Sequence, residues 1–315
     1  VDYKQFTVAE RSNAPYTLLP AGYVAVVGDA TLSNGRVAQL QIELRTIKFD
    51  NIATMKSAKL VVGDVAMCKR YSAGGELVNG LEFEIVAGST GTDDGGSFHN
   101  LTNGTQARLI VGSRVDIKTF GCVIGNVLNN LTLQSAINFC VAEGKILHVS
   151  RGTYIYTVPM VVSGALKIQG DTRTVSFLLP VGCDGLHYTA AFSGCEIKDL
   201  AIKQAVRYTD TPNSFTAIKN LDNTNKSQYY IFENIRIDGF ETALAIDRLW
   251  NTKIENFQVL FSHVGIVASL SVLVHIDNSE INVDSSVGSR GLVCATHSEG
   301  FFISNTLFFG CEIGI

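Results

Sequence analysis

Charge is scarce in this chain of 315 residues, in which Lys, Arg, Asp and Glu together make up 17%, below the usual share of about a quarter. The net charge is −4 and no cluster of Lys and Arg stands out, so nothing points to a nucleic-acid partner. Proline is also rare, with 5 residues against 29 glycines, while 46% of the residues are apolar. This composition is typical of a β-rich protein with many buried strands and tight turns.

Paired cysteines and a secretory signal are missing as well. Without a CxxC pair or a metal-ligand spacing, the cysteines are interpreted as reduced, buried thiols, and we expect no metal and no cofactor. The first residues, VDYKQFTVAERSN, lack the basic start and apolar core of a signal peptide. They also lack an initiator Met, so we expect further residues upstream. The seven cysteines stand at positions 68, 122, 140, 183, 195, 294 and 311.

One stretch is apolar enough to raise the question of a membrane helix. Residues 259–276 are nearly all apolar, but Ser and His interrupt them at five positions and β-branched residues dominate. A membrane helix needs about 20 predominantly apolar residues in a row. We therefore interpret this stretch as buried strands and expect no membrane insertion.

The helical signal is strongest over residues 131–143. One face carries apolar residues at spacings of three and four, namely Leu133, Ala136, Ile137, Cys140 and Val141. Asn129 or Asn130 can cap the start of this helix, and Gly144 can end it. A shorter helical pattern runs through "NIATMKSAKL" near residue 52, and beyond residue 144 the patterns indicate strands.

The second half of the chain repeats itself. The copies are "FENIRI" (232–237), "IENFQV" (254–259), "IDNSEI" (276–281) and "ISNTLF" (303–308), with "IKDLAI" (197–202) before them. The Asn residues at 234, 256, 278 and 305 are 22, 22 and 27 residues apart. A period of this length built from strands predicts a parallel β-helix, with Asn at a corner that needs the αL conformation and allows a side-chain ladder.

A second motif, Gly followed by an aliphatic residue, recurs at Gly185, Gly265, Gly291 and Gly314. Because a β-helix ends in an open apolar core and unpaired strand edges, the helix over 131–143 is interpreted as its cap. The chain stops at "FFGCEIGI", inside a repeat, and we expect a β-helix truncated there. The sequence thus predicts an all-β fold, a right-handed parallel β-helix capped by one short helix and preceded by a small mixed β-rich domain.

The opening of this region resembles that of pectate-lyase-superfamily β-helices, as found in bacteriophage tailspikes. The matching pieces are "VDIKTFG" (115–121) and "GTYIY" (152–156), and residues 56–101 are similar to the small domain before many tailspike β-helices. The family's G-D-G turn is here Ile124-Gly125-Asn126, and its acidic pair is Asn129-Asn130.

The resemblance implies a domain order and a place of action. Residues 1–50 would attach to a particle through phage tail or baseplate proteins, 51–112 would form the small domain, and 113–315 the capped β-helix. The protein would be a homotrimer in the virion tail, made in the cytoplasm of the bacterial host. Its partner would be host capsular polysaccharide or lipopolysaccharide.

Carboxylates in register are the first candidates for chemistry. Aligning the repeats puts Glu233, Glu255 and Asp277 in one column, with Lys198 before them and Ser304 after. Coils stack about 4.8 Å apart, so neighbouring carboxylates approach the spacing of glycosidase pairs, and their repulsion would raise one pKa. The alternative is a charged face that solvent and nearby Lys side chains screen.

Aromatic residues are the second candidates. Tyr229, Tyr230 and Trp250 flank the coil of Asn234 and could stack on sugar rings, or pack in the core or a trimer interface. The insertion at 208–230 lengthens one coil, and such loops often line binding faces. The histidines at 187, 263, 275 and 297 show no partner spacing for a triad or zinc.

The predicted function is that of a tailspike, a receptor-binding protein that binds host polysaccharide and depolymerises it by glycosidic hydrolysis, with β-elimination as the second reaction. One alternative is a virion structural or adsorption protein without enzymatic activity. Another is a free bacterial polysaccharide lyase or epimerase, which the absence of a signal peptide disfavours.

Overall fold

The computed structural model describes residues 46–311, apart from 79–80, 126–127, 190–191, 221–226 and 296, together with four short strands before residue 46. The chain divides into two compact units, 1–46 and 47–315. Most of the predicted attachment segment, 1–50, lies outside the described residues. The strands of the first unit pair antiparallel, β1 (Tyr16–Leu19) with β2 (Tyr23–Val26) and β3 (Ala30–Thr31) with β4 (Val37–Ala38).

The second unit begins with a small five-stranded sheet in the order β5-β6-β7-β9-β8, accompanied by one short helix. Asn51 caps this helix by accepting a hydrogen bond from Thr54 N at 3.0 Å. Met55 packs with Phe83 and Ile85 in a fully buried core. The elements are β5 (Thr46–Asn51), α2 (Ile52–Lys56), β6 (Val65–Arg70), β7 (Glu82–Val86), β8 (Phe98–Asn100) and β9 (Gln106–Leu109).

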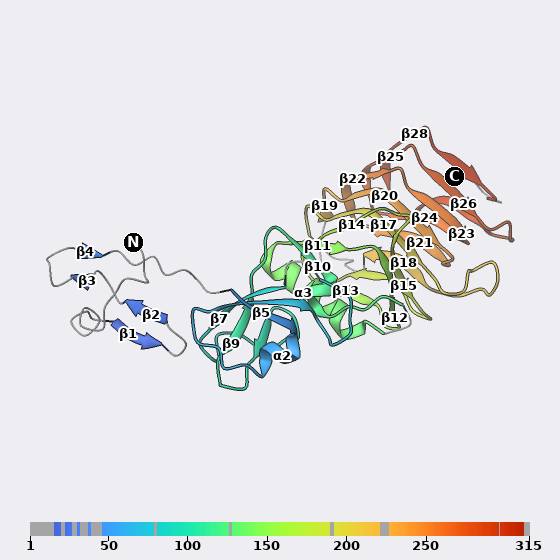
Figure 1. The fold of residues 1–315 in the computed structure, drawn as a ribbon. Helices are drawn as coiled ribbons and strands as arrows, with labels where there is room; N and C mark the ends of the chain where they lie inside the picture. Colours follow the sequence, from blue (N-terminus) through green and yellow to red (C-terminus); the bar gives the residue numbers. More distant parts are fainter. Residues whose placement is uncertain are drawn as a thin grey trace. The chain divides into compact units, whose positions relative to one another are not determined.

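The rest of the unit is a parallel β-helix, in which each strand pairs with its equivalent in the next coil (Figure 1). The face that carries the Asn motif has the order β10-β11-β14-β17-β20-β22-β25-β28. These strands are β10 (Arg114–Asp116), β11 (Ile146–Val149), β14 (Lys167–Gly170), β17 (Glu196–Lys203), β20 (Ile231–Asp238), β22 (Leu249–Glu255), β25 (Val272–Asp277) and β28 (Glu299–Ser304).

Two further faces complete each coil. The longer strands β17 and β20 continue past the Asn corner and pair with the shorter strands of the second face. The shorter strands of that face are β12 (Gly152–Tyr156), β15 (Ser176–Pro180), β23 (Gln258–Ser262), β26 (Glu280–Val283) and β29 (Leu307–Phe309). The third face consists of β13 (Met160–Val162), β16 (Leu186–Tyr188), β18 (Thr216–Asn220), β21 (Thr242–Asp247), β24 (Val264–Ser269) and β27 (Arg290–Ala295). The two-residue β19 (Ser227–Gln228) pairs with β22.

Alternation of side chains builds the core, and the predicted Asn corner is confirmed. Phe232, Ile254 and Ile276 are buried, and the residues that follow each of them point outward. The corner residues have positive φ, for example 54° at Asn234 and 50° at Asn256. Asn234 donates to Asp199 Oδ1 at 2.6 Å, and Asn256 donates to Asn234 Oδ1 at 3.1 Å.

Replacing Asn234 by Ala should lower the free energy of unfolding by about 1–3 kcal/mol, since Ala tolerates αL poorly and breaks both hydrogen bonds. Asn234→Gly keeps the backbone accessible and removes only the hydrogen bonds, so it should cost about 1 kcal/mol. Chemical unfolding of the two variants measures the difference. Equal losses of unfolding free energy in the two variants would show that the αL conformation at Asn234 does not affect stability.

The helix α3 (Asn130–Glu143) closes the first coils, as predicted, and packs against β13 and β11 (Figure 1). Leu133, Ala136, Ile137 and Cys140 are its buried residues, and Gly144 ends it in αL. Asn129 occupies the N-cap position, but its side chain makes no cap bond to the helix. It bonds instead to the backbone of Val123, at 2.7 Å to N and 3.0 Å to O, and so fixes the preceding loop. Where the structure describes the chain, no helix has the length and apolar character needed to cross a membrane.

Candidate functional site

The predicted acidic ladder, Glu233, Glu255 and Asp277, is in register on the outer face of the β-helix. Glu233 pairs with Glu255 and Glu255 with Asp277, flanked by Lys198 and Ser304. The same column runs back through earlier coils, which the repeat alignment did not reach. Those further members are Asp116, His148 and Gln169.

Lysines neutralise much of this ladder. Lys198 Nζ lies 2.8 Å from Glu233 Oε2, and Lys253 pairs with Glu255. The hydrogen bond from Lys198 lowers the pKa of Glu233, and the hydrogen bond from Ser304 lowers the pKa of Asp277. Neither carboxyl has the raised pKa that a general acid needs.

The three predicted sugar-stacking residues have different surroundings. Tyr229 is 57% exposed and has φ 59°, while Trp250 is half-buried in β22. Tyr229 N donates to Trp250 O at 3.0 Å, so the two residues lie together. Tyr230 is only 2% exposed and packs edge-on against Tyr188, with ring centroids 5.6 Å apart. Tyr230 is therefore a core residue and is not available to a sugar at the surface.

A different group of polar side chains gathers at the turns that lead from the second face into the third. Glu241, His263 and Asp284 occupy this turn in three successive coils, since His263 N donates to Phe240 O, and Asp284 N donates to Ser262 O. We call these three residues the corner column. His263 Nδ1 lies 3.1 Å from Asp284 Oδ1, and their side chains are 16% and 8% exposed. The carboxylate thus fixes the orientation of the imidazole ring.

Tyr208 joins the corner column from a neighbouring coil. Its ring stacks on His263 at a centroid distance of 5.2 Å, and its hydroxyl forms a hydrogen bond with Glu241. Burial, followed by this hydrogen bond and the charges of Glu241 and Asp284, raises the pKa of Tyr208 to about 12. Tyr208 is therefore a neutral hydrogen-bond donor rather than a base.

The segment that carries Tyr208, residues 204–215, is here called the corner loop. It leaves the coil after β17 and returns at β18. Asn213 fixes it to the next coil by donating to Gly239 O at 3.1 Å and accepting from Glu241 N at 3.2 Å. A β-carbon added to Gly239 would lie 3.0 Å from the Arg207 Cα, so the corner loop packs tightly on this turn. The corner loop is thus held beside the corner column by specific contacts.

A hollow of about 370 Å³ adjoins the corner column. Ser286 lines the hollow and donates to Asp284 Oδ2 at 2.7 Å. The volume of the hollow is within the usual range of ligand pockets, about 300–1,000 Å³. The remaining lining residues are Ser285, Val287, Gly310 and Cys311.

Sequence reasoning missed the corner column because its residues lie in turns, where no strand pattern marks them. A signal was nevertheless present, since Glu241, His263 and Asp284 are 22 and 21 residues apart, close to the period of the Asn motif. Other histidines also lie beside carboxylates, either within one coil or between coils. His187 Nε2 lies 2.7 Å from Asp184 Oδ2, and His148 lies between Asp116 and Asp171 at 3.1 and 2.9 Å. No group of three or more potential metal ligands occurs among the described residues.

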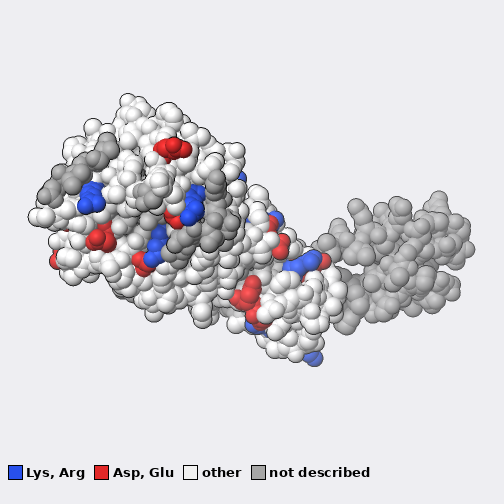
Figure 2. Space-filling model, turned by 180° about the vertical axis from the view of Figure 1, so that it is seen from behind, with Lys and Arg blue, Asp and Glu red and all other residues white. Residues whose placement is uncertain are grey.

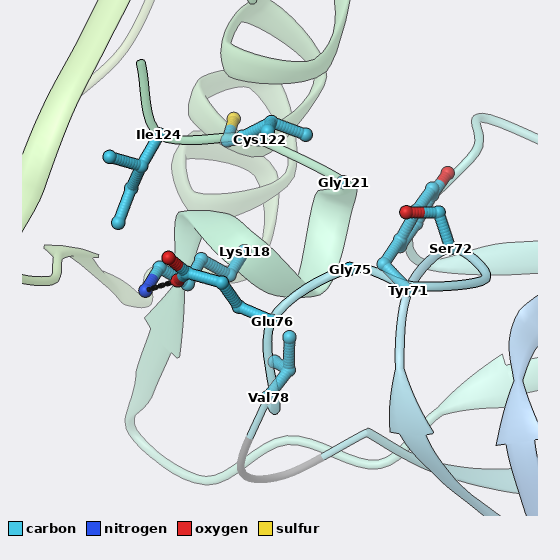
Figure 3. Close-up of a pocket in the computed structure, with 10 residues that line it drawn as sticks. Tyr71, Ser72, Gly75, Glu76, Val78, Lys118, Gly121, Cys122 and Ile124 are labelled. Carbon is cyan, nitrogen blue, oxygen red and sulfur yellow. Dashed lines mark hydrogen bonds and ion pairs between the residues drawn. The ribbon is translucent and has the colours of Figure 1, made fainter.

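A small cavity of about 60 Å³ lies where the small sheet meets the start of the β-helix (Figure 3). Glu76 and Lys118 point toward each other across it, 2.6 Å apart. Cys122 also lines it, but burial raises the pKa of this thiol to about 12 and makes it a poor nucleophile. The cavity is too small for a sugar, and we interpret it as part of the joint between the two substructures.

Charged side chains are few on the face seen in Figure 2, where basic and acidic groups lie next to one another within a mostly uncharged surface. Such a surface has no broad field of one sign. Any electrostatic attraction of a ligand to this face therefore depends on small local groups of charged side chains.

Comparison with known proteins shows similarity in structure alone, since no family model and no curated protein matches the sequence. Tailspike protein 2 of Escherichia coli O157:H7 bacteriophage CAB120 superposes with a TM-score of 0.66 at 14% identity, covering 95% of this chain and 44% of that one. Tailspike gp49 of Acinetobacter baumannii bacteriophage Fri1, a capsular polysaccharide depolymerase, gives 0.54 at 13%, covering 82% and 60%.

The third comparison is with WceF of Pantoea stewartii, a glycan biofilm modifying enzyme with a tailspike-like parallel β-helix, which gives a TM-score of 0.52 at 12% identity. The match covers 93% of this chain and 53% of WceF. The chain thus spans about half the length of these proteins. The likeness predicted from the opening motif is confirmed at the level of fold: the chain has the parallel β-helix of phage tailspikes.

Proposed function

We propose that this chain belongs to a phage tailspike that binds a polysaccharide on the host surface and cleaves it. The observation that carries this proposal is the corner column, which lies beside a hollow of about 370 Å³ and beside the corner loop that specific contacts hold in place. Two of the structurally similar proteins are described as acting on glycans. Trimeric assembly, a place in the virion tail and attachment through residues 1–50 belong to the same proposal.

The corner column can supply both groups that glycosidic hydrolysis needs. One carboxyl group must protonate the leaving oxygen while another activates water, and in inverting enzymes about 6.5–9.5 Å separates them. Equivalent positions two coils apart are about 10 Å apart along the stack. We assign Glu241 as the acid, and Asp284 with His263 as the base that activates water. In β-elimination, the second candidate reaction, His263 would instead remove a proton next to a sugar carboxylate.

The acidic ladder remains the other proposed location for catalysis, with Tyr229 and Trp250 as sugar-stacking residues on the same outer face. Its carboxylates are in register, but lysines pair with two of them. The variants Glu233→Gln, Glu255→Gln and Asp277→Asn separate the two locations. A loss of about a hundredfold in cleavage by any of them would assign catalysis to the ladder, and full activity in all three would make it a solvated face.

The proposed activity is tested by incubating the protein with capsular polysaccharide and lipopolysaccharide from a panel of bacteria while reducing ends are followed. We expect one polymer to release oligosaccharides of defined length. Ultraviolet absorbance of an unsaturated sugar would identify β-elimination, and its absence hydrolysis. Binding without release would make this an adsorption protein, and the absence of both would contradict the proposal.

A further inference from the structure

Three basic side chains converge next to the corner column, and we call them the basic cluster. Lys203 ends β17, Arg236 lies in β20 of the next coil, and Arg207 comes from the corner loop. The strand register places Lys203 opposite Asp238 and Ala201 opposite Arg236. All three cations therefore face the same small region of the second face.

Among the residues that the structure describes, a single carboxylate, Asp238, forms ion pairs with this basic cluster. Arg236 Nη2 lies 3.0 Å from Asp238 Oδ2, and Arg207 Nε lies 3.7 Å from Asp238 Oδ1. The Asp238 side chain is 6% exposed, so it is enclosed by these partners. Within the described residues Lys203 forms no hydrogen bond and no ion pair, and its ammonium lies 4.2 Å from the centre of the Phe177 ring. Two positive charges are thus in excess.

The surroundings of Lys203 disfavour its charged form. Burial lowers the pKa of this ammonium, and the charge of Arg236 lowers it further, although Asp238 acts in the opposite direction. A lysine with enough anionic neighbours would show the opposite shift, as Lys198 does between Glu196 and Glu233. An additional anion at this place would therefore stabilise the charged form of Lys203.

An exposed aromatic ring borders the basic cluster. Phe261 has φ 54° and lies at an irregularity in the pairing of β23 with β26, so a β-bulge turns its side chain outward. A bulky residue with positive φ is unusual and strained. The ring is 36% exposed, and the Arg207 guanidinium lies 4.1 Å from its centre. Such a ring offers an apolar face to a sugar.

We propose that Lys203, Arg207 and Arg236 form a subsite for an acidic group of the polysaccharide, a sugar carboxylate or a phosphate, with the attached sugar ring against Phe261. This inference rests on the proposed function and specifies its substrate class. The forked guanidinium groups match the geometry of both oxyanions, and the subsite would place the neighbouring glycosidic bond at the corner column.

The contact of Arg207 with Phe261 could instead serve only to hold the corner loop. However, Asn213 already fixes the corner loop through Gly239 and Glu241, and Lys203 takes no part in that attachment. Lys203 is therefore the residue that best distinguishes an acidic subsite from a loop anchor.

The test measures binding of two matched pairs of polymers: polygalacturonate against its methyl ester, and lipopolysaccharide against the same material after dephosphorylation. We expect at least one acidic member to bind about tenfold more tightly than its uncharged form, with a steep loss of affinity as salt is raised. The pair that shows the difference identifies carboxylate or phosphate. Lys203→Gln and Arg207→Gln should each reduce this affinity about tenfold or more.

Arg236 is left unchanged because its removal would leave the enclosed Asp238 without its closest partner. Lys69→Gln, at the exposed position of β6 in the small sheet, removes the same charge elsewhere and should bind like the wild type. Equal binding of charged and uncharged polymers, or unchanged binding by both cluster variants, would overturn the subsite while leaving the proposed function intact. Failure to bind any polysaccharide would overturn both.

Discussion

Replacing Glu241 by Gln is expected to slow polysaccharide cleavage by about 100- to 10,000-fold, which is the usual contribution of a general acid to the rate. Binding of the polysaccharide should remain nearly unchanged. The amide keeps the shape of the side chain and can still accept the hydrogen bond from Tyr208, but it cannot deliver a proton. His263→Gln should have a comparable effect, since it removes the ring that Asp284 orients at 3.1 Å. Rates of reducing-end release at saturating and limiting polymer separate cleavage from binding.

The matched control is Glu280→Gln. Glu280 is a carboxylate of the neighbouring second face, half-buried and bonded to Gln258 Nε2 at 2.9 Å. Losing this charge should leave cleavage within about threefold of the wild type, because the hydrogen bond lies outside the corner column. Wild-type rates in both Glu241→Gln and His263→Gln would show that the corner column is not the catalytic site.

Replacing Gly265 by Ala is expected to lower the free energy of unfolding by about 1–3 kcal/mol, the usual range for overpacking a core. A β-carbon at this position would lie 2.4 Å from the carbonyl oxygen of Gly291 and 2.4 Å from a methyl of Ile281. Neither neighbour can withdraw easily, since one is backbone and the other is buried in the next coil. The midpoint of chemical unfolding measures the loss.

Gly112→Ala is the control for this experiment. A β-carbon there meets no atom within 4 Å, so the substitution should leave the unfolding midpoint unchanged or raise it slightly through the unfolded state. If Gly265→Ala were as stable as Gly112→Ala, the close approach of successive coils at this position would not constrain the fold.

The fold could be predicted in large part because its signals are local and repeated. The period of the Asn motif gave the coil length, and the preference of Asn for αL gave the corner. The Gly-aliphatic motif was visible too, but the sequence did not show why glycine is needed there. A β-carbon at Gly265 would clash with Gly291, which only the stacking of coils brings near. Contacts between coils cannot be predicted from the residues of a single repeat.

The site could be predicted less well, for two physical reasons. The sequence left Tyr230 open between sugar stacking and packing in the core or an interface. It lies two residues before the buried Phe232, and alternation along the strand turns it inward as well. The register of the acidic ladder followed from the alignment, but the pairing of Lys253 with Glu255 depends on side-chain geometry. The corner column lies in turns, where the patterns used for strands have no meaning.

The path of the corner loop also bears on how such proteins diversify. The chain leaves the coil after Lys203 and re-enters it at Thr216, which pairs in register with Thr242 of the next coil. The strands on both sides of the corner loop thus keep their register with the next coil. The loop also contacts that coil at its two ends, where Gln204 N donates to Asp238 O and Phe215 O accepts from Thr242 N, and through Asn213. If the chain has the proposed function, exchange of the corner loop between related proteins would change the polysaccharide that is bound while the register of the β-helix strands is kept, so that binding specificity and folding would evolve as separate traits.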